Sequence, residues 1–107
     1  MKIAPLALLA AAPLLAWPPA TAAQDPAAQA LDEAMQKMMH GMHMHSTGDP
    51  DRDFAVMMIV HHQGAIDMAK VELEYGDDPE MRALAAEIIA AQEQEIAEMK
   101  AWLEEQD

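Results

Sequence analysis

The 107-residue sequence contains no cysteine, and its 6 lysine and arginine residues are outnumbered by 19 aspartate and glutamate residues. Without cysteine the chain forms no disulfide bond and cannot carry a lipid on an N-terminal cysteine. The formal net charge of −13 at pH 7 repels nucleic acids and anionic lipids and attracts cations. We therefore expect neither nucleic acid nor a membrane surface as a partner.

The sequence also lacks the residue patterns of common catalytic sites. After residue 23 it has one serine, Ser46, and it contains no glycine-rich phosphate loop and no HExxH motif. A ferritin-like di-iron or di-manganese centre needs Glu-x-x-His pairs on its helices. Met58 and Ile59 stand three positions before His61 and His62. These absences predict a protein that is not an enzyme.

No hydrophobic run is long enough to span a bilayer comfortably. The longest, IAPLALLAAAPLLAW, follows Lys2, contains two prolines and precedes the small residues Ala20-Thr21-Ala22. This order of features is typical of a secretory signal peptide, with a retained membrane helix as the alternative. We expect removal of residues 1–23 by cleavage after Ala22 or Ala23, which leaves a soluble periplasmic or secreted protein.

The remaining domain, residues 24–107, has 84 residues and, without Lys2, 5 basic against 19 acidic side chains, a net charge of −14. A hydrophobic core of this size is only marginally stabilising. Oligomerisation or a bound metal is therefore a plausible additional source of stability.

The dipeptide Asp-Pro occurs three times, each time before a long helix-compatible stretch. Aspartate caps the free amide groups of a first turn, and proline supplies a preset φ at the first helical position. The short link YGDDP predicts an antiparallel hairpin of the last two helices, which also brings Glu72 near Arg82 as an expected ion pair. The sequence thus predicts an all-α, small helical bundle with helices over residues 26–40, 50–75 and 79–105, the second ended by Gly76.

His61 and His62 lie in the middle of the second helix, and both are expected to face inward. At about 100° per residue, they lie opposite a polar stripe on the same helix. The hairpin places them at the level of Gln92 and Glu95, which interrupt the apolar face of the third helix. The polar stripe of the second helix consists of Gln63, Asp67, Lys70 and Glu74.

Two interpretations of these histidines remain open. In the first interpretation they belong to a hydrogen-bond network that fixes the register of the helices, because a buried imidazole needs a hydrogen-bond partner. In the second interpretation they also bind a metal ion, because Met57, His61 and Met68 lie within roughly 40° of one another around the helix and offer their side chains on one side. Gln92 or Glu95 would then hold the free ring nitrogen of a histidine and set its tautomer.

The segment MMHGMHMH, residues 38–45, favours the metal. On a helix its side chains point in every direction, so core packing cannot use them all. Thioether sulfur favours Cu(I) and Ag(I), and imidazole binds either copper oxidation state; a flexible Met-rich adhesive surface is the alternative. The candidate ligands in this segment are Met38, Met39, His40, Met42, His43, Met44 and His45.

The run from Gly48 to Leu103, preceded by MMHGM, closely resembles the bacterial family called domain of unknown function 305, which includes CopM-like exported copper-binding proteins. The resemblance depends on the signature HHQGAIDMA of residues 61–69, paired downstream with Gln92 and Glu95. It implies a ferritin-like helical bundle, export, and copper or silver binding in copper tolerance. The matching family positions are Met57, His61, His62, Met68 and Met99.

One position departs from that pattern. The family commonly has proline directly before its histidine pair, where this chain has Val60. A kink in the second helix is therefore not expected here.

These observations lead to one functional expectation and one alternative. We expect an exported protein that holds Cu(I), or Ag(I) as its mimic, and acts as a copper buffer or chaperone, with a copper-donor or copper-acceptor protein as a possible partner. Residues 38–45 would capture ions loosely, and the second helix, with Met99 opposite, would hold one more specifically. The apolar run FAVMMIV, residues 54–60, predicts a homo-oligomer. The alternative is a structural or interaction module whose Met-rich face docks a partner helix.

Overall fold

The computed structural model describes residues 25–43 and 46–107. The expected signal peptide and the candidate ligands Met44 and His45 lie outside these ranges. Within them the chain forms three helices and no strand: α1 (Pro26–Gly41), α2 (Pro50–Tyr75) and α3 (Pro79–Gln106). The predicted all-α class is confirmed, and each helix begins and ends within one residue of its expected position.

Each helix begins as its Asp-Pro dipeptide predicts. The aspartate carboxylate accepts a hydrogen bond of 2.9 to 3.1 Å from a backbone N–H of the first turn, and the proline that follows is the first helical residue. These bonds satisfy amide groups that have no partner inside the helix. The three capping residues are Asp25, Asp49 and Asp78.

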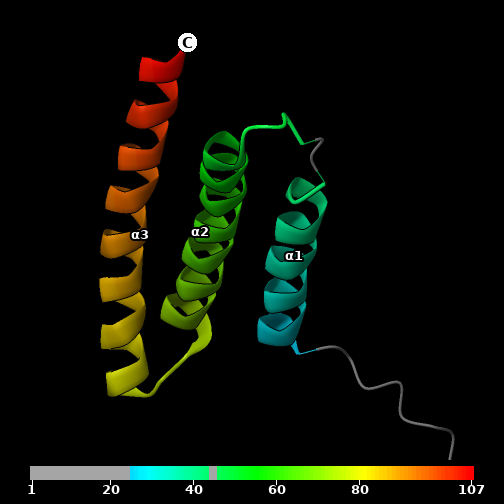
Figure 1. Ribbon diagram of the computed structural model, residues 1–107. Coiled ribbons are helices and arrows are strands. Elements are labelled where there is room, and N and C mark those ends of the chain that lie inside the picture. The colour runs from blue at the N-terminus through cyan, green and yellow to red at the C-terminus, as the bar shows by residue number, and fades with distance from the viewer. Residues whose placement is uncertain (1–24, 44–45) are drawn as a thin grey trace, which may run out of the picture.

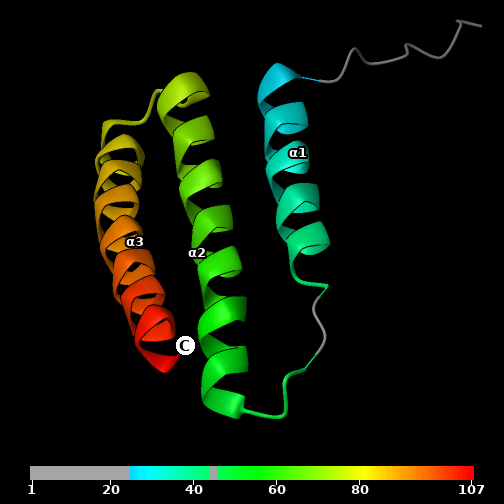
Figure 2. The ribbon, with the colours of Figure 1, turned by 90° about the horizontal axis from the view of Figure 1, so that it is seen from above.

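The three helices lie side by side in a single layer with α2 in the middle. Figures 1 and 2, two views at right angles, both show the order α3, α2, α1. In the described part of the chain α2 contacts both neighbours, whereas α1 and α3 do not contact each other. Helices α2 and α3 form the predicted antiparallel hairpin, and α1 also runs antiparallel to α2.

Arg82 closes the hairpin in a way that the sequence did not predict. Its guanidinium donates hydrogen bonds to the backbone carbonyls of Leu73, at 2.7 Å, and Gly76, at 3.0 Å. The last carbonyls of a helix have no hydrogen-bond partner inside the helix. At the end of α2, the Arg82 guanidinium is that partner. The expected ion pair is wrong: among the described residues Arg82 has no charge partner within 4.0 Å, and the Glu72 carboxylate folds back against Gly76 instead.

Two glycines allow α1 to approach α2 closely. A methyl group on Gly64 would lie 2.5 Å from Sδ of Met38, and one on Gly41 would lie 2.9 Å from Cγ1 of Val60. Both distances are shorter than van der Waals contact. The glycine in the HHQGA motif is therefore the position over which the Met38 side chain packs.

The core of this layer is small. In the described ranges no side chain is less than 2% exposed, and the hydrophobic residues that count as buried are four alanines and two isoleucines. Several larger apolar side chains are partly open to solvent. The six buried residues are Ala34, Ala55, Ile66, Ala69, Ala85 and Ile96.

None of the three described helices combines the length and the hydrophobicity that crossing a membrane requires.

Candidate functional site

His62 is the one buried polar residue among those described, with 7% of its surface exposed. Its Nε2–H donates a short hydrogen bond across the hairpin to the Glu95 carboxylate. This contact confirms that the polar interruptions of α2 and α3 meet at one level. Among the described residues, two buried atoms beside this contact have no hydrogen-bond partner, Nδ1 of His62 and Oε1 of Gln92.

The His62–Glu95 pair has two possible roles. A neutral imidazole that donates from Nε2 keeps an unprotonated Nδ1 with a free lone pair. Metal-binding histidines commonly donate their other ring N–H to a carboxylate, which fixes the tautomer and the ring orientation. The same contact also fixes the register of α2 against α3. The unpartnered Nδ1 fits the first role, and the second role does not use it.

His61 is exposed, and the prediction that both histidines face inward is wrong for this residue. Consecutive helical residues point about 100° apart, and the rings of His61 and His62 lie 6.3 Å apart at an interplanar angle of 63°. Because α2 has neighbours on two opposite sides, the direction between them is open to solvent. His62 points toward α3, and His61 points into that open direction.

Met57 and His61 are brought together, whereas the other expected ligands of this face are not. Met57 is 38% exposed and lies one turn before His61, at a spacing that places side chains side by side. Met68 lies roughly 10 Å beyond His61 along the axis, in a hollow of about 300 Å³ that Met81 and Leu84 also line.

Met99 lies near the other end of the hairpin. It lines a hollow of about 310 Å³ together with Phe54, Ala55 and Trp102. Met68 and Met99 therefore belong to separate hollows, on either side of the histidine level. Within one chain, the shared direction of Met57, His61 and Met68 around α2 does not bring them to a shared height.

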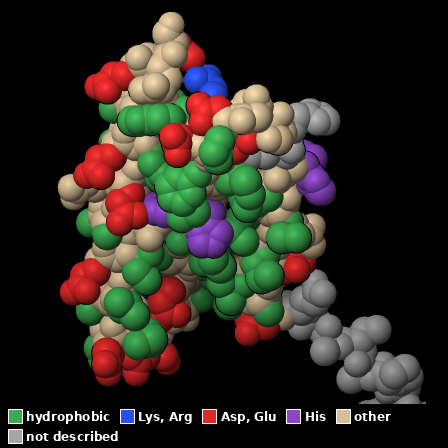
Figure 3. Space-filling view, in the orientation of Figure 1, with side chains coloured by type: hydrophobic (Ala, Val, Ile, Leu, Met, Phe, Trp, Pro, Cys, Tyr) green, Lys and Arg blue, Asp and Glu red, His purple; other side chains and the backbone are tan. Residues whose placement is uncertain are grey.

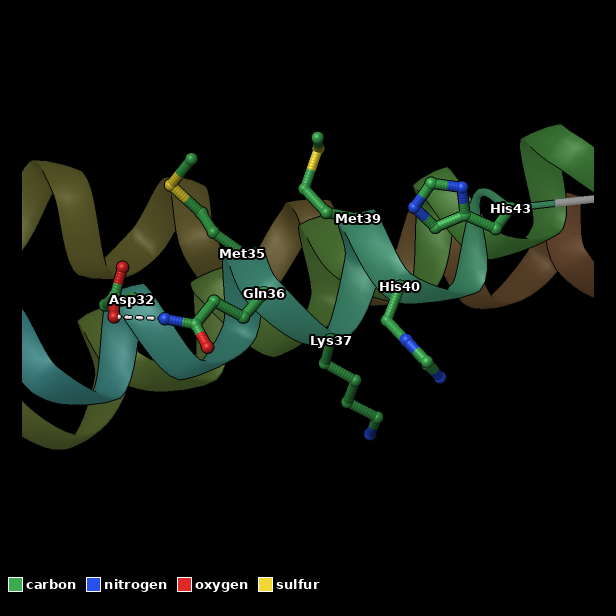
Figure 4. Close-up of a pocket in the computed structure, with 7 residues that line it drawn as sticks. All are labelled: Asp32, Met35, Gln36, Lys37, Met39, His40 and His43. Carbon is green, nitrogen blue, oxygen red and sulfur yellow. Dashed lines mark hydrogen bonds between the residues drawn. The ribbon is translucent and has the colours of Figure 1, made fainter.

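The described part of the 38–45 segment is divided among several directions. Met38 packs on Gly64, Met39 is 60% exposed, and Met42 forms the C-terminal cap of α1. Figure 4 shows Met39 and His43 on one side of the helix, with His40 pointing away from them. The expectation that these side chains cannot all pack in a core is confirmed for this part of the segment.

Met35 belongs to this group, although sequence reasoning missed it. It is 51% exposed and points to the same side of α1 as Met39 and His43 (Figure 4). The three residues are spaced four apart, the spacing at which side chains stack along one side of a helix. This regular spacing was visible in the sequence one turn before the MMHGMHMH segment begins.

The exposed thioethers and His61 lie on one side of the layer. The helical positions of Met35 and Met39 place them on the side of α1 opposite Lys37, which pairs with Asp67 at 3.6 Å across the other side of the layer. Figure 3 shows histidine surrounded by hydrophobic side chains in the middle of one face, with acidic side chains along the edge formed by α3. We call this surface the Met/His face and define it by Met35, Met39, Phe54, Met57, His61, Ala65, Met68, Met81 and Leu84.

The opposite side of the layer is more polar. A groove of about 460 Å³ on this side is floored by α2, and Lys37, Gln63, Asp67 and Lys100 contribute to its walls. His40 lines this groove as well. It also lines an open hollow of about 680 Å³ on α1 together with Met35, Met39 and His43 (Figure 4).

Carboxylates and imidazoles alone do not form a metal site in residues 25–43 and 46–107, because no three of them come together in a suitable geometry. The thioether sulfur atoms of the Met/His face are further candidate ligands. Thioether ligands select soft ions such as Cu(I), whereas Mg²⁺ and Ca²⁺ prefer oxygen.

The signature of residues 61–69 predicts membership of one family. No curated protein sequence matches the chain. A family model matches it over residues 9–104, and its description, Domain of unknown function (DUF305), names no activity. The chain therefore belongs to the domain of unknown function 305 family.

Proposed function

We propose that this chain is an exported protein that binds Cu(I), or Ag(I) as its mimic, through methionine and histidine side chains, and that it acts as a copper buffer or chaperone in metal tolerance. One observation carries the proposal: methionines stand next to imidazoles at helical spacing on a solvent-exposed surface. The exposed fractions are 51% for Met35, 60% for Met39 and 38% for Met57. Export is proposed from the N-terminal sequence.

The chemistry of these groups supports a soft ion. Thioether sulfur binds Cu(I) well, and imidazole adds a nitrogen ligand. In an oxidising compartment cysteine would form disulfides, whereas methionine neither pairs nor titrates. The excess of acidic side chains raises the local concentration of any cation, an effect that salt weakens.

Two groups of residues are proposed as ligands. On α2 they are Met57 and His61, together with His62, whose Nε2–H bonds to Glu95 and whose Nδ1 has no partner among the described residues. On α1 they are Met35, Met39 and His43, which form an open row suited to loose capture. Met38 is not proposed as a ligand, because its side chain already packs on Gly64.

Competition for Cu(I) against a chromogenic chelator tests the proposal. The double variant Met57→Leu/His61→Gln removes sulfur and nitrogen while it keeps similar volumes, so we expect affinity to fall about tenfold or more, or about 1.4 kcal/mol. The matched control is Met58→Leu, which removes a neighbouring half-buried thioether of the same helix. Wild-type affinity no better than that of a scrambled peptide of equal composition would refute copper binding.

A second function is favoured by the extent of exposed apolar surface. Phe54 is 62% exposed, and Met81 and Leu84 are each 45% exposed, so the Met/His face also suits an interaction module that docks an amphipathic helix. In that case the Met57→Leu/His61→Gln variant would leave Cu(I) competition unchanged. The same experiment therefore separates the two functions.

A further inference from the structure

The three helices leave the Met/His face uncovered. They form one layer, and its buried hydrophobic residues are four alanines and two isoleucines. Domains are generally built from at least two packed layers, because an apolar face has to be buried against another element. A second layer for this face has to come from outside α1, α2 and α3.

We infer that a second copy of this chain supplies that layer, and that each copper site is completed by side chains from both copies. This inference rests on the proposed function for its metal and on the fold for its dimer. A second copy is available wherever the chain itself is present. Pairs of identical chains most often associate through one self-complementary face about a two-fold axis.

The face is large enough for a stable dimer. The helices contain 16, 26 and 28 residues, and at 1.5 Å per residue and a spacing of about 10 Å they present roughly 1,000 Å² on one side. A standard interface buries about 800 Å² per partner. The layer therefore offers enough area without any contribution from its edges.

Charge also favours this face. Two copies with a net charge of −13 repel each other over most of their surfaces. From Phe54 to Met68 the central stripe of α2 on this face carries no carboxylate; Glu72, which lines the same hollow as Met68, ends it, and in Figure 3 acidic side chains line the edge formed by α3. Two copies that meet along the stripe from Phe54 to Met68 therefore bring no carboxylate of this stripe against another. The stripe consists of Phe54, Met57, His61, Ala65 and Met68.

The geometry of α2 determines which residues would meet. A two-fold axis that lies between the layers and crosses α2 at its midpoint makes the two α2 helices antiparallel. Met57 and Met68 lie equally far from this midpoint, on either side of it. The partner's Met68 would then lie level with Met57, one turn from His61. The dimer would bring Met57 and His61 of each chain together with Met68 of the other chain, and its symmetry would give two such sites.

The dimer itself is tested first, without metal. Sedimentation equilibrium of the purified full chain should give a dimer. Phe54→Glu places a charge on the face near the start of α2, at a side chain that is 62% exposed, and should give a monomer. Gln63→Glu adds the same charge to an exposed position on the opposite side of α2 and should leave the dimer intact. A wild-type chain that is monomeric at every concentration, or a Phe54→Glu variant that still dimerises, would overturn the inference.

Sharing of the site is tested by mixing two variants. His61→Gln changes an exposed residue, and Met68→Leu keeps the volume of a half-buried one. Each variant alone should lose tight Cu(I) binding. After the two are refolded together, about half of the dimers contain one copy of each variant, and each of these has one intact site. The mixture should regain about a quarter of the wild-type number of tight sites.

Two outcomes of the mixing experiment would overturn site sharing. One is a mixture that binds no more tightly held Cu(I) than the separate variants, as expected if every site lies within one chain. The other is wild-type affinity in Met68→Leu alone, as expected if the two α2 helices are parallel. If the wild-type chain fails to bind Cu(I), the proposed function is refuted, and the sedimentation result still decides whether the dimer exists.

Discussion

At the scale of single residues, Gly64 sets the distance between α1 and α2. A methyl group at this position would meet three atoms of the Met38 side chain, including Cβ at 3.0 Å. The flexible end of Met38 can rotate away, but its Cβ is fixed to the backbone of α1. A larger residue at position 64 therefore has to push the two helices apart.

Gly64→Ala should destabilise the chain by about 1 kcal/mol. Overpacking costs about 1–3 kcal/mol, and the better helix propensity of alanine offsets about 1 kcal/mol of that cost. In a Met38→Ala background the same change should cost less, because Sδ and Cγ of Met38, at 2.5 and 2.8 Å, are gone while Cβ at 3.0 Å remains. Urea unfolding of the four proteins gives the coupling energy. An equal effect of Gly64→Ala in both backgrounds would show that Met38 is not the obstacle.

Glu95 acts on His62 through one hydrogen bond, and this contact gives a second test at the residue scale. Glu95→Gln keeps an acceptor but removes the carboxylate, and loss of a group that orients a metal-binding histidine lowers metal affinity about 10–100-fold. We expect Cu(I) affinity to fall by about tenfold, measured by chelator competition. Glu93→Gln, at an exposed position on the same helix, should leave the affinity unchanged. If both variants bind as the wild type does, His62 is a structural residue.

At the scale of secondary-structure elements, the connection between α2 and α3 depends on Arg82. Arg82→Gln should destabilise the chain by about 1.5 kcal/mol, because it removes charge-assisted hydrogen bonds to the carbonyls of Leu73 and Gly76. The measurement is the urea midpoint. Glu72→Gln should have a much smaller effect, since Glu72 does not pair with Arg82. Equal losses in the two variants would restore the ion pair expected from the sequence.

The start of α2 makes stability depend on pH. Hydrogen bonds from Ser46 and Thr47 lower the pKa of Asp53 below its ordinary value of 3.8. A carboxylate with a lowered pKa stabilises the folded chain above its unfolded-state pKa, and this contribution is lost as the pH falls through the folded-state pKa.

Asp53→Asn should therefore melt at a lower temperature than the wild type at pH 7, and the difference should shrink as the pH is lowered below about 4. Thermal melts of both proteins at pH 7 and at a pH below about 4 measure this change. Asp51→Asn is the matched control, because Asp51 also lies in the first turn of α2 and shares the effect of the helix dipole. A difference between wild type and Asp53→Asn that is the same at both pH values would contradict the assignment.

The helices themselves were predictable from sequence, because their starting signals are local. Each Asp-Pro dipeptide supplies both a cap and a preset φ, and the short link fixes the hairpin so that the level of His62 and Glu95 follows from equal rise along the two helices. The role of Arg82 was not predictable in this way. It depends on where the last carbonyls of α2 lie in space.

At the scale of the whole molecule, the arrangement of helices decides which side chains remain open. The wheel of α2 predicts one apolar side, but contacts with both α1 and α3 divide that side, so that His62 is buried and His61 is exposed. A helical wheel also shows only the direction of a side chain around the axis. Met57 and Met68 point in a similar direction, but they lie at different positions along the axis. Neither result follows from one helix alone, because each depends on neighbours supplied by the rest of the fold.

Exposed methionine and histidine on one side of a single helical layer are the basis of the proposed copper binding. X-ray absorption at the copper edge of the Cu(I)-loaded chain tests this most directly, because it identifies the atoms around the metal. The account predicts both sulfur and nitrogen ligands, with fewer sulfur ligands in the Met57→Leu/Met68→Leu variant, in which Met35 and Met39 remain. Copper surrounded by nitrogen and oxygen alone, or sulfur ligation that is unchanged in that variant, would contradict it.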